Sequence, residues 1–182
     1  MKKYTRFSEI PKFISDGTYR ASYTLHHFVR FIQEEVETLD LQLDPDFQRG
    51  HVWTEEQQVA WLEYNLRGGR SGNVIYLNKP SWNAPVRHGA YDDYVCVDGL
   101  QRITACQRFA NNEVRVFGSY FNEFEDSMRV LDYNLQVCVN DLKTKAEVLQ
   151  WYIDMNSGGT PHSEAEIARV KHILEKEKTN NK

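Results

Sequence analysis

The clearest combination of ligand-binding residue types lies at residues 98–102, which read Asp-Gly-Leu-Gln-Arg at an expected strand-to-helix junction. A glycine there lets the backbone approach a ligand closely, and the first turn of the helix leaves N–H groups that favour an anion. Arg102 offers forked donors to a phosphate, and Asp98 could bind a metal ion or the ribose or base of a nucleotide. The alternative is structural: Asp98 caps the helix, Gly99 forms a turn and Arg102 is a solvated surface residue. Taken alone, the residues favour neither interpretation.

Two further segments contain polar groups that could contact a nucleotide. Gln48 and Arg49 lie in a loop bounded by Pro and Gly, shortly before Trp53, so they could bind a phosphate while the indole stacks on a base. The segment 156–160 contains two glycines that expose backbone donors. Each segment also has a structural interpretation, a loop braced by its arginine and a turn between helices, and taken alone each favours the structural one.

Hydrophobic periodicity predicts the elements that position these segments. Helices are expected over residues 25–39, 54–68, 100–109, 145–155 and 163–174, with Thr-Glu-Glu-Gln and Ser-Glu-Ala-Glu capping boxes opening the second and the last. Strands are expected over 73–77, 94–97, 114–117 and 135–139, with a shorter candidate at 41–43. The outline is an α+β domain with helices interspersed among short strands.

Composition narrows the class of protein. At 182 residues the chain is expected to form a single domain over 1–182, with a core at about 20–175 and a fraying charged tail over 175–182. With 41% hydrophobic residues, global disorder is excluded, and the net charge of −4 means that any nucleic-acid site must be a local patch. The three cysteines lack metal-site spacing, and there is neither a signal peptide nor a membrane segment, so we expect a cytoplasmic protein without a membrane partner.

Taken together, these segments resemble the DGQQR-motif domains at the N-terminus of GmrSD-type modification-dependent restriction endonucleases, which belong to the ParB/sulfiredoxin superfamily. The resemblance runs in order from about Leu25 to Ile173. It rests on Asp44, Pro45, Phe47, Gln48, Arg49, Trp53, Glu63, residues 98–102, Asn156, Gly158, Gly159 and Thr160. It implies a ParB/sulfiredoxin-like fold: a small mixed sheet with interspersed helices and a C-terminal helical pair.

The resemblance also implies a ligand, because Gly99-x-x-Arg102-x-x-Ala105 is similar to the phosphate-binding box of that superfamily. A nucleoside triphosphate with Mg²⁺ would then lie at the start of the helix. The implied catalytic residues are Asp98, Gln101 and Arg102, with Asp98 also the metal ligand and Gln101 orienting a phosphate or water. The implied nucleotide-binding residues are Gln48, Arg49, Gly99, Asn156 and Thr160.

Two departures from the family pattern limit what the resemblance implies. Leu100 replaces the usual second residue of the motif, a Gln, and stands where sulfiredoxin has its catalytic Cys, so sulfiredoxin chemistry is not supported. The sequence also contains no His-Asn-His nuclease module. Nuclease activity of that kind is therefore expected from a separate nuclease subunit, or is absent.

Two hypotheses follow, and the sequence leaves open whether the protein is an enzyme. The first is a nucleotide-binding and nucleotide-hydrolysing ParB-like domain, an NTPase acting in DNA processing or phage–host conflict, with ParB-like nuclease activity as an extension and plain or modified DNA as a partner. The alternative is a non-catalytic module that binds DNA or protein, as an inhibitor or decoy of full-length restriction relatives.

Overall fold

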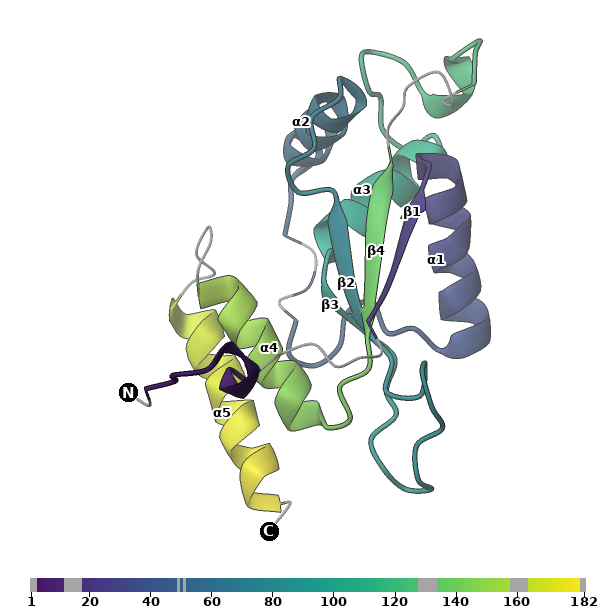
Figure 1. The fold of residues 1–182 in the computed structure, drawn as a ribbon. Coiled ribbons are helices and arrows are strands. Elements are labelled where there is room, and N and C mark those ends of the chain that lie inside the picture. The colour runs from purple at the N-terminus through teal and green to yellow at the C-terminus, as the bar shows by residue number, and fades with distance from the viewer. Residues whose placement is uncertain are drawn as a thin grey trace.

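A four-stranded mixed sheet forms the centre of the protein, with helices on both of its faces (Figure 1). The computed structural model describes residues 3–11, 18–48, 50, 52–127, 134–157 and 164–180. The elements are η1 (Phe7–Glu9), β1 (Tyr19–Tyr23), α1 (Leu25–Leu39), α2 (Glu55–Leu66), β2 (Val74–Asn78), β3 (Val95–Asp98), α3 (Leu100–Ala110), η2 (Phe121–Glu123), β4 (Leu135–Asn140), α4 (Lys145–Ser157) and α5 (Glu164–Asn180).

The strand order is β1-β4-β2-β3. Strands β2 and β4 pair in parallel, whereas the outer pairs β1–β4 and β2–β3 are antiparallel. The β2–β3 register shifts between Tyr76 and Leu77. The sheet is therefore mixed, and the expected α+β class is confirmed.

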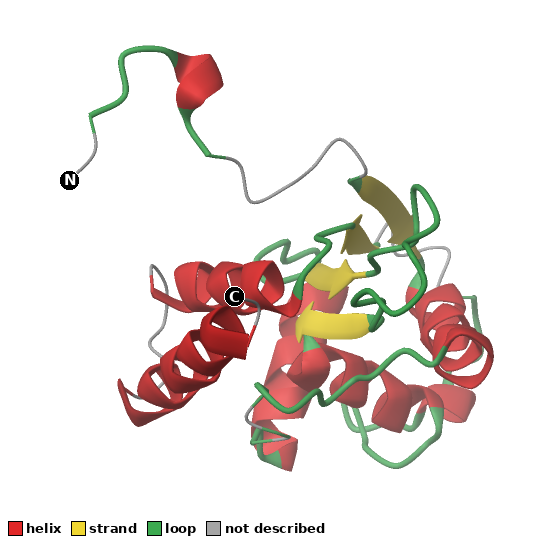
Figure 2. Ribbon diagram, turned by 90° about the horizontal axis from the view of Figure 1, so that it is seen from below, coloured by secondary structure: helices red, strands yellow, loops and turns green. Residues whose placement is uncertain are grey.

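Each face of the sheet is covered by its own set of helices, because successive side chains of a strand point to opposite faces. On β3, Cys96 joins the larger apolar cluster, together with Phe28 of α1 and Ile103 of α3. Its neighbours Val95 and Val97 join a second cluster that contains residues of α4 and α5. Figure 2 shows the α4–α5 pair on one side of the strands and the other helices on the opposite side.

Local sequence signals determine where the helices begin. Leu25, Phe28 and Ile32 lie on one stripe of α1 and are fully buried. Helix α2 begins at the expected capping box, in which the Thr54 hydroxyl accepts from the amide of Gln57, and the Gln57 side chain accepts from the amide of Thr54. The expected cap of the last helix, Ser163, lies outside the described residues.

The elements differ from the sequence expectations in four places. Residues 114–117 form no strand: they lead into a turn, with a single bridge between Val116 and Ser119. The candidate at 41–43 is reduced to one bridge, between Gln42 and Val95. The last helix is longer than expected, because α5 continues past residue 174 to Asn180. Strand β1 was not predicted, although Tyr19, Ala21 and Tyr23 alternate with two polar residues along it.

The described cysteines are buried and free. Burial raises the pKa of the Cys96 and Cys106 thiols, so neither supplies a thiolate near neutral pH. The described residues contain no group of three or more His, Cys, Asp and Glu side chains arranged to hold a metal ion. None of the helices described has the length and hydrophobicity of a membrane span.

Asn78 gives a test of how the sheet is joined to the segment before α4. Its buried amide donates to the carbonyl of Leu142 at 3.1 Å and accepts from the amide of Leu142 at 2.9 Å. We expect Asn78→Ala to lower the free energy of unfolding by about 2 kcal/mol or more, because it leaves a buried donor and acceptor without partners. The exposed Asn83→Ala should change it by less than about 0.5 kcal/mol. Urea denaturation measures both, and equal effects would contradict this role for Asn78.

Candidate functional site

The junction between β3 and α3 requires a glycine at position 99. Gly99 has φ +135°, a conformation that L-amino acids with side chains rarely adopt. A Cβ at this position would lie 2.7 Å from Cδ1 of Ile75 on the neighbouring strand β2. The end of β3 therefore packs directly on β2, and α3 begins at this contact.

Asp98 and Arg102 form an ion pair across the first turn of α3. Nη2 of Arg102 lies 2.6 Å from Oδ1 of Asp98, and Nη1 donates to the carbonyl of Val74 at 2.6 Å. The Arg102 side chain is 14% exposed and that of Asp98 is 38% exposed. The structural interpretation of Arg102 as a solvated surface residue is therefore wrong, because its guanidinium links α3 to β2.

The backbone at the start of α3 offers free donors. Gly99 is the N-cap and provides no side-chain cap, and the amide of Leu100 faces the thiol of Cys96. Within the described part of the chain, the amides of Gln101 and Arg102 have no hydrogen-bond acceptor. These two N–H groups, at the positive end of the helix dipole, are the part of the site best suited to an anion.

Gln101 fastens the loop before α2 to the start of α3. Its Oε1 accepts from the amides of Val52 and Trp53, each at 2.9 Å, and its Nε2 donates to the carbonyl of Gly50 at 2.8 Å. All three bonds go to backbone groups roughly fifty residues earlier in the chain. Gln101 is thus a positioning residue here, and its implied role of orienting a phosphate or water stays a prediction.

The preceding part of the same loop is held from two sides. Nε2 of Gln48 donates to the carbonyls of Cys96 and Val97 on β3, each at 3.0 Å. From α5, the guanidinium of Arg169 donates to the carbonyls of Asp46, Phe47 and Gln48 at 2.7, 2.9 and 2.7 Å. The loop 46–48 is therefore fixed between the sheet and the C-terminal helical pair.

Arg169 is the positioning residue that sequence reasoning missed. The sequence suggested that Arg49 braces this loop through carbonyl bonds, and the structure gives such bonds to an arginine more than a hundred residues later. A second cation, Lys145 of α4, lies 2.7 Å from Oδ2 of Asp46. No sequence signal indicates these contacts, because the partners of Arg169 are backbone carbonyls.

Only the first part of the segment 156–160 lies within the described residues. Nδ2 of Asn156 donates to the carbonyl of Tyr152 one turn earlier in α4, at 2.7 Å. The Tyr152 ring packs edge-on against Phe47, with 5.4 Å between the centroids. This contact brings the end of α4 to the same loop as Gln48. Two of the predicted site residues, Arg49 and Thr160, lie outside the described residues, as do Gly158 and Gly159.

Trp53 belongs to the packing of the loop. Its ring lies 6.1 Å from that of Trp61, and its carbonyl accepts from Nε2 of Gln58. Gln58 in turn accepts from Arg108 at 2.9 Å. These contacts support the structural interpretation of the indole over a role in base stacking.

The residues at the start of α3 suit a metal ion that is bound together with phosphate groups. Asp98 contributes one partly exposed carboxylate, whose Oδ1 is paired with Arg102. Since Mg²⁺ is usually bound by one or two carboxylates together with substrate phosphates and water, Asp98 suits a Mg²⁺–nucleotide complex. It does not by itself form a metal site.

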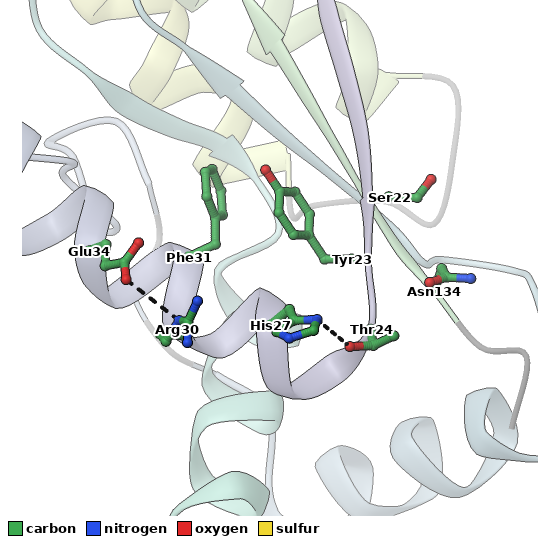
Figure 3. A pocket seen from close by; sticks show the side chains of 8 residues that line it. All are labelled: Ser22, Tyr23, Thr24, His27, Arg30, Phe31, Glu34 and Asn134. Atoms are coloured by element: carbon green, nitrogen blue, oxygen red, sulfur yellow. Dashed lines mark hydrogen bonds and ion pairs between the residues drawn. The ribbon is translucent and has the colours of Figure 1, made fainter. Parts of the chain in front are cut away.

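A separate pocket of about 370 Å³ lies between β1 and the first half of α1 (Figure 3). It is lined by Ser22, Tyr23, Thr24, His27, Arg30, Phe31, Glu34 and Asn134. Its polar groups are largely paired with one another: Arg30 with Glu34 at 3.5 Å, and His27 with the hydroxyl of Thr24 at 3.1 Å. None of the predicted site residues lines it.

Comparison with known proteins agrees with the motif at the α3 junction. Residues 30–129, more than half of the chain, match the family described as GmrSD restriction endonuclease, N-terminal domain. The matched range contains Gln48, residues 98–102 and Glu63, and it ends before α4. No curated protein and no solved structure matches the chain.

Gln101→Ala tests whether this side chain holds the loop. We expect the amides of Val52 and Trp53 to exchange with deuterium about 5- to 30-fold faster, because each loses its acceptor. The matched control is Gln107→Ala on the same helix, whose side chain has no hydrogen-bond partner among the described residues. Unchanged exchange in Gln101→Ala, read by mass spectrometry or NMR, would contradict the positioning role.

Proposed function

The chain belongs to the family of GmrSD restriction endonuclease N-terminal domains, and from this membership we propose that it takes part in DNA processing associated with restriction and phage defence. Its own contribution is the binding of a nucleoside triphosphate with Mg²⁺ at the start of α3. We extend this proposal to hydrolysis of the bound nucleotide. DNA, plain or modified, and a separate nuclease subunit are the proposed partners.

One observation carries the nucleotide proposal: the first turn of α3 combines free backbone donors with a guanidinium and a carboxylate. The amides of Gln101 and Arg102 have no acceptor in the described structure. An anionic group at this point would gain both the helix dipole and the remaining N–H groups of Arg102. Phosphate is the ligand that suits this combination of groups.

The proposed roles follow from position. The backbone after Gly99 and Arg102 would hold phosphate oxygens, and Asp98 would bind Mg²⁺, which would neutralise charge on the phosphates. Gln48 and Gln101 would keep the neighbouring loop in place, and Arg49, the next residue in the sequence after Gln48, would bind the nucleotide. Asn156 near the end of α4 and the later Thr160 would add polar contacts. Any catalysis would come from positioning and charge stabilisation rather than from a covalent intermediate.

The second candidate is a non-catalytic module that binds DNA or protein. A specific observation favours it: in the described structure the motif side chains are engaged in holding the fold. Arg102 contacts Asp98 and Val74, and Gln101 has bonds to three backbone groups. A motif retained for these contacts alone would need no nucleotide.

Calorimetric titration with ATP, GTP, CTP and UTP in Mg²⁺ tests the nucleotide proposal. We expect at least one triphosphate to bind, and Arg102→Lys to weaken it about tenfold or more, because lysine lacks the planar fork. Asp98→Asn should remove the dependence of affinity on Mg²⁺. Arg30→Ala, an exposed arginine on α1 (67% side-chain exposure), is the control that should leave binding unchanged.

The outcomes separate the two candidates. Binding followed by multiple-turnover phosphate release supports the enzymatic form of the proposal. Binding without turnover supports a nucleotide-sensing module. If the folded wild-type protein binds none of the four triphosphates, the nucleotide proposal is wrong and the second candidate stands.

A further inference from the structure

We propose that the turn at Phe117–Gly118 is a stacking element for an unpaired base of a DNA strand. This inference concerns a surface away from the motif at the start of α3, and it does not depend on nucleotide binding there. The turn lies in the segment that follows α3, at the same end of the molecule as α2 (Figure 1).

Phe117 adopts a backbone conformation that is unfavourable for a large side chain. Its φ is +53° and that of Gly118 is +79°, so both central residues of the turn are left-handed. Such turns favour Asn, Asp and Gly at the first of these positions, and an aromatic residue there is an outlier. The ring does not compensate by burial, since Phe117 remains 43% exposed. Strain without a packing benefit is typical of residues retained for a contact with a ligand.

The surrounding contacts hold this turn rigidly. The amides of Val116 and Ser119 each donate to the carbonyl of the other residue, at 2.9 and 3.2 Å. The amide of Phe117 donates to Oε1 of Glu63 on α2 at 2.9 Å, and Nη1 of Arg115 donates to the carbonyl of Gly118 at 2.8 Å. Val116 is fully buried beneath the turn. The exposed ring is therefore presented from a fixed backbone, which lowers the entropy cost of binding.

Arginines and aromatic rings alternate around the turn. The guanidinium of Arg67 lies 5.0 Å from the centroid of the Phe117 ring, and that of Arg115 lies 4.1 Å from the centroid of Tyr120. Tyr64, one turn before Arg67 on α2, is 51% exposed. We call this surface the basic-aromatic patch; it consists of Tyr64, Arg67, Arg115, Phe117 and Tyr120.

One cation of the patch has no carboxylate partner. Arg115 is paired with Glu123, which also accepts from the amide of Tyr120, and Glu63 accepts from the amide of Phe117. Among the residues that the structure describes, no carboxylate pairs with Arg67. Its guanidinium can therefore contact a phosphate beside the Phe117 ring, while the chain as a whole carries a charge of −4.

The arrangement favours an unpaired base over a protein partner. A protein interface would be expected to show a continuous apolar core, whereas here the rings of Phe117 and Tyr120 each carry a guanidinium. An aromatic ring that carries an arginine on one face offers its other face to a base, and stacking of this kind does not depend on the base sequence. The bases of a duplex are already stacked, so the patch should prefer single-stranded or locally unpaired DNA.

Phe117→Asn is the most informative substitution, because Asn is the residue that this backbone conformation prefers. We expect its melting temperature to equal or exceed that of the wild type, since strain is relieved. Its affinity for a single-stranded oligonucleotide should fall about tenfold or more, because the stacking ring is lost. Phe117→Tyr and Phe117→Trp should keep wild-type affinity. Fluorescence anisotropy with a labelled oligonucleotide measures binding, and a 2-aminopurine base in the strand should be quenched by the wild type but not by Phe117→Asn.

Two further variants test the charges and the location. Arg67→Gln should reduce the slope of log affinity against log salt by about one, because one phosphate contact is lost. Arg30→Gln, at an exposed arginine on α1, is the control and should not change the slope. An excess of ATP should leave oligonucleotide binding intact, which separates this surface from the site at the start of α3.

Four results would overturn the proposal. They are the absence of oligonucleotide binding by the folded wild-type protein at physiological salt, equal affinities for wild type and Phe117→Asn, tighter binding of duplex than of single strand, and displacement of the strand by ATP. Each of these results is a measurement of oligonucleotide binding. Failure of triphosphates to bind at α3 would leave this inference unaffected, so the two proposals fail separately.

Discussion

The contact between Gly99 and Ile75 is the constraint on which the arrangement of the site depends. Because a Cβ at position 99 would lie 2.7 Å from the Ile75 side chain, the end of β3 can meet β2 this closely only with a glycine. Helix α3 then begins directly at the edge of the sheet. Its first turn places Arg102 beside the carbonyl of Val74 and Gln101 beside the loop 50–53. A larger residue at position 99 would shift the start of α3 and would therefore disturb all of these hydrogen bonds together.

The loop before α2 is held by side chains from distant parts of the chain and by one of its own. Gln101 of α3 and Arg169 of α5 bind backbone groups of the loop, and the loop residue Gln48 binds backbone carbonyls of β3. Replacing Gln48 would therefore remove a contact that positions the loop, whereas the contacts of Gln101 and Arg169 do not depend on the side chains of the loop. Together these contacts explain how a segment rich in polar groups is held in a defined conformation beside the proposed ligand site.

The sequence was most informative where the signal is local. The stripe of Leu25, Phe28 and Ile32 predicted α1, the Thr54–Gln57 capping box predicted the start of α2, and the Asp-Gly dipeptide predicted the junction before α3. The failures have a common physical cause, which is that the deciding contacts are distant in sequence. Val114 and Val116 alternate as in a strand, yet they anchor a turn whose amide is bound by Glu63. The contacts of Arg169 could not be predicted, since any arginine on α5 reads as a solvated residue until the helical pair is placed.

The proposed nucleotide would couple ligand binding to the stability of the fold at the start of α3. Arg102 pairs with Asp98 and bonds to Val74, so it is already part of the link between α3 and β2. A phosphate that recruits this guanidinium competes with Asp98, and the carboxylate released from the pair needs a new cation. A Mg²⁺ ion carried by the phosphates would supply that cation at the same point. An anion without a metal would leave Asp98 facing a second negative charge, so the ligand we propose is the metal complex of a nucleotide rather than the free nucleotide.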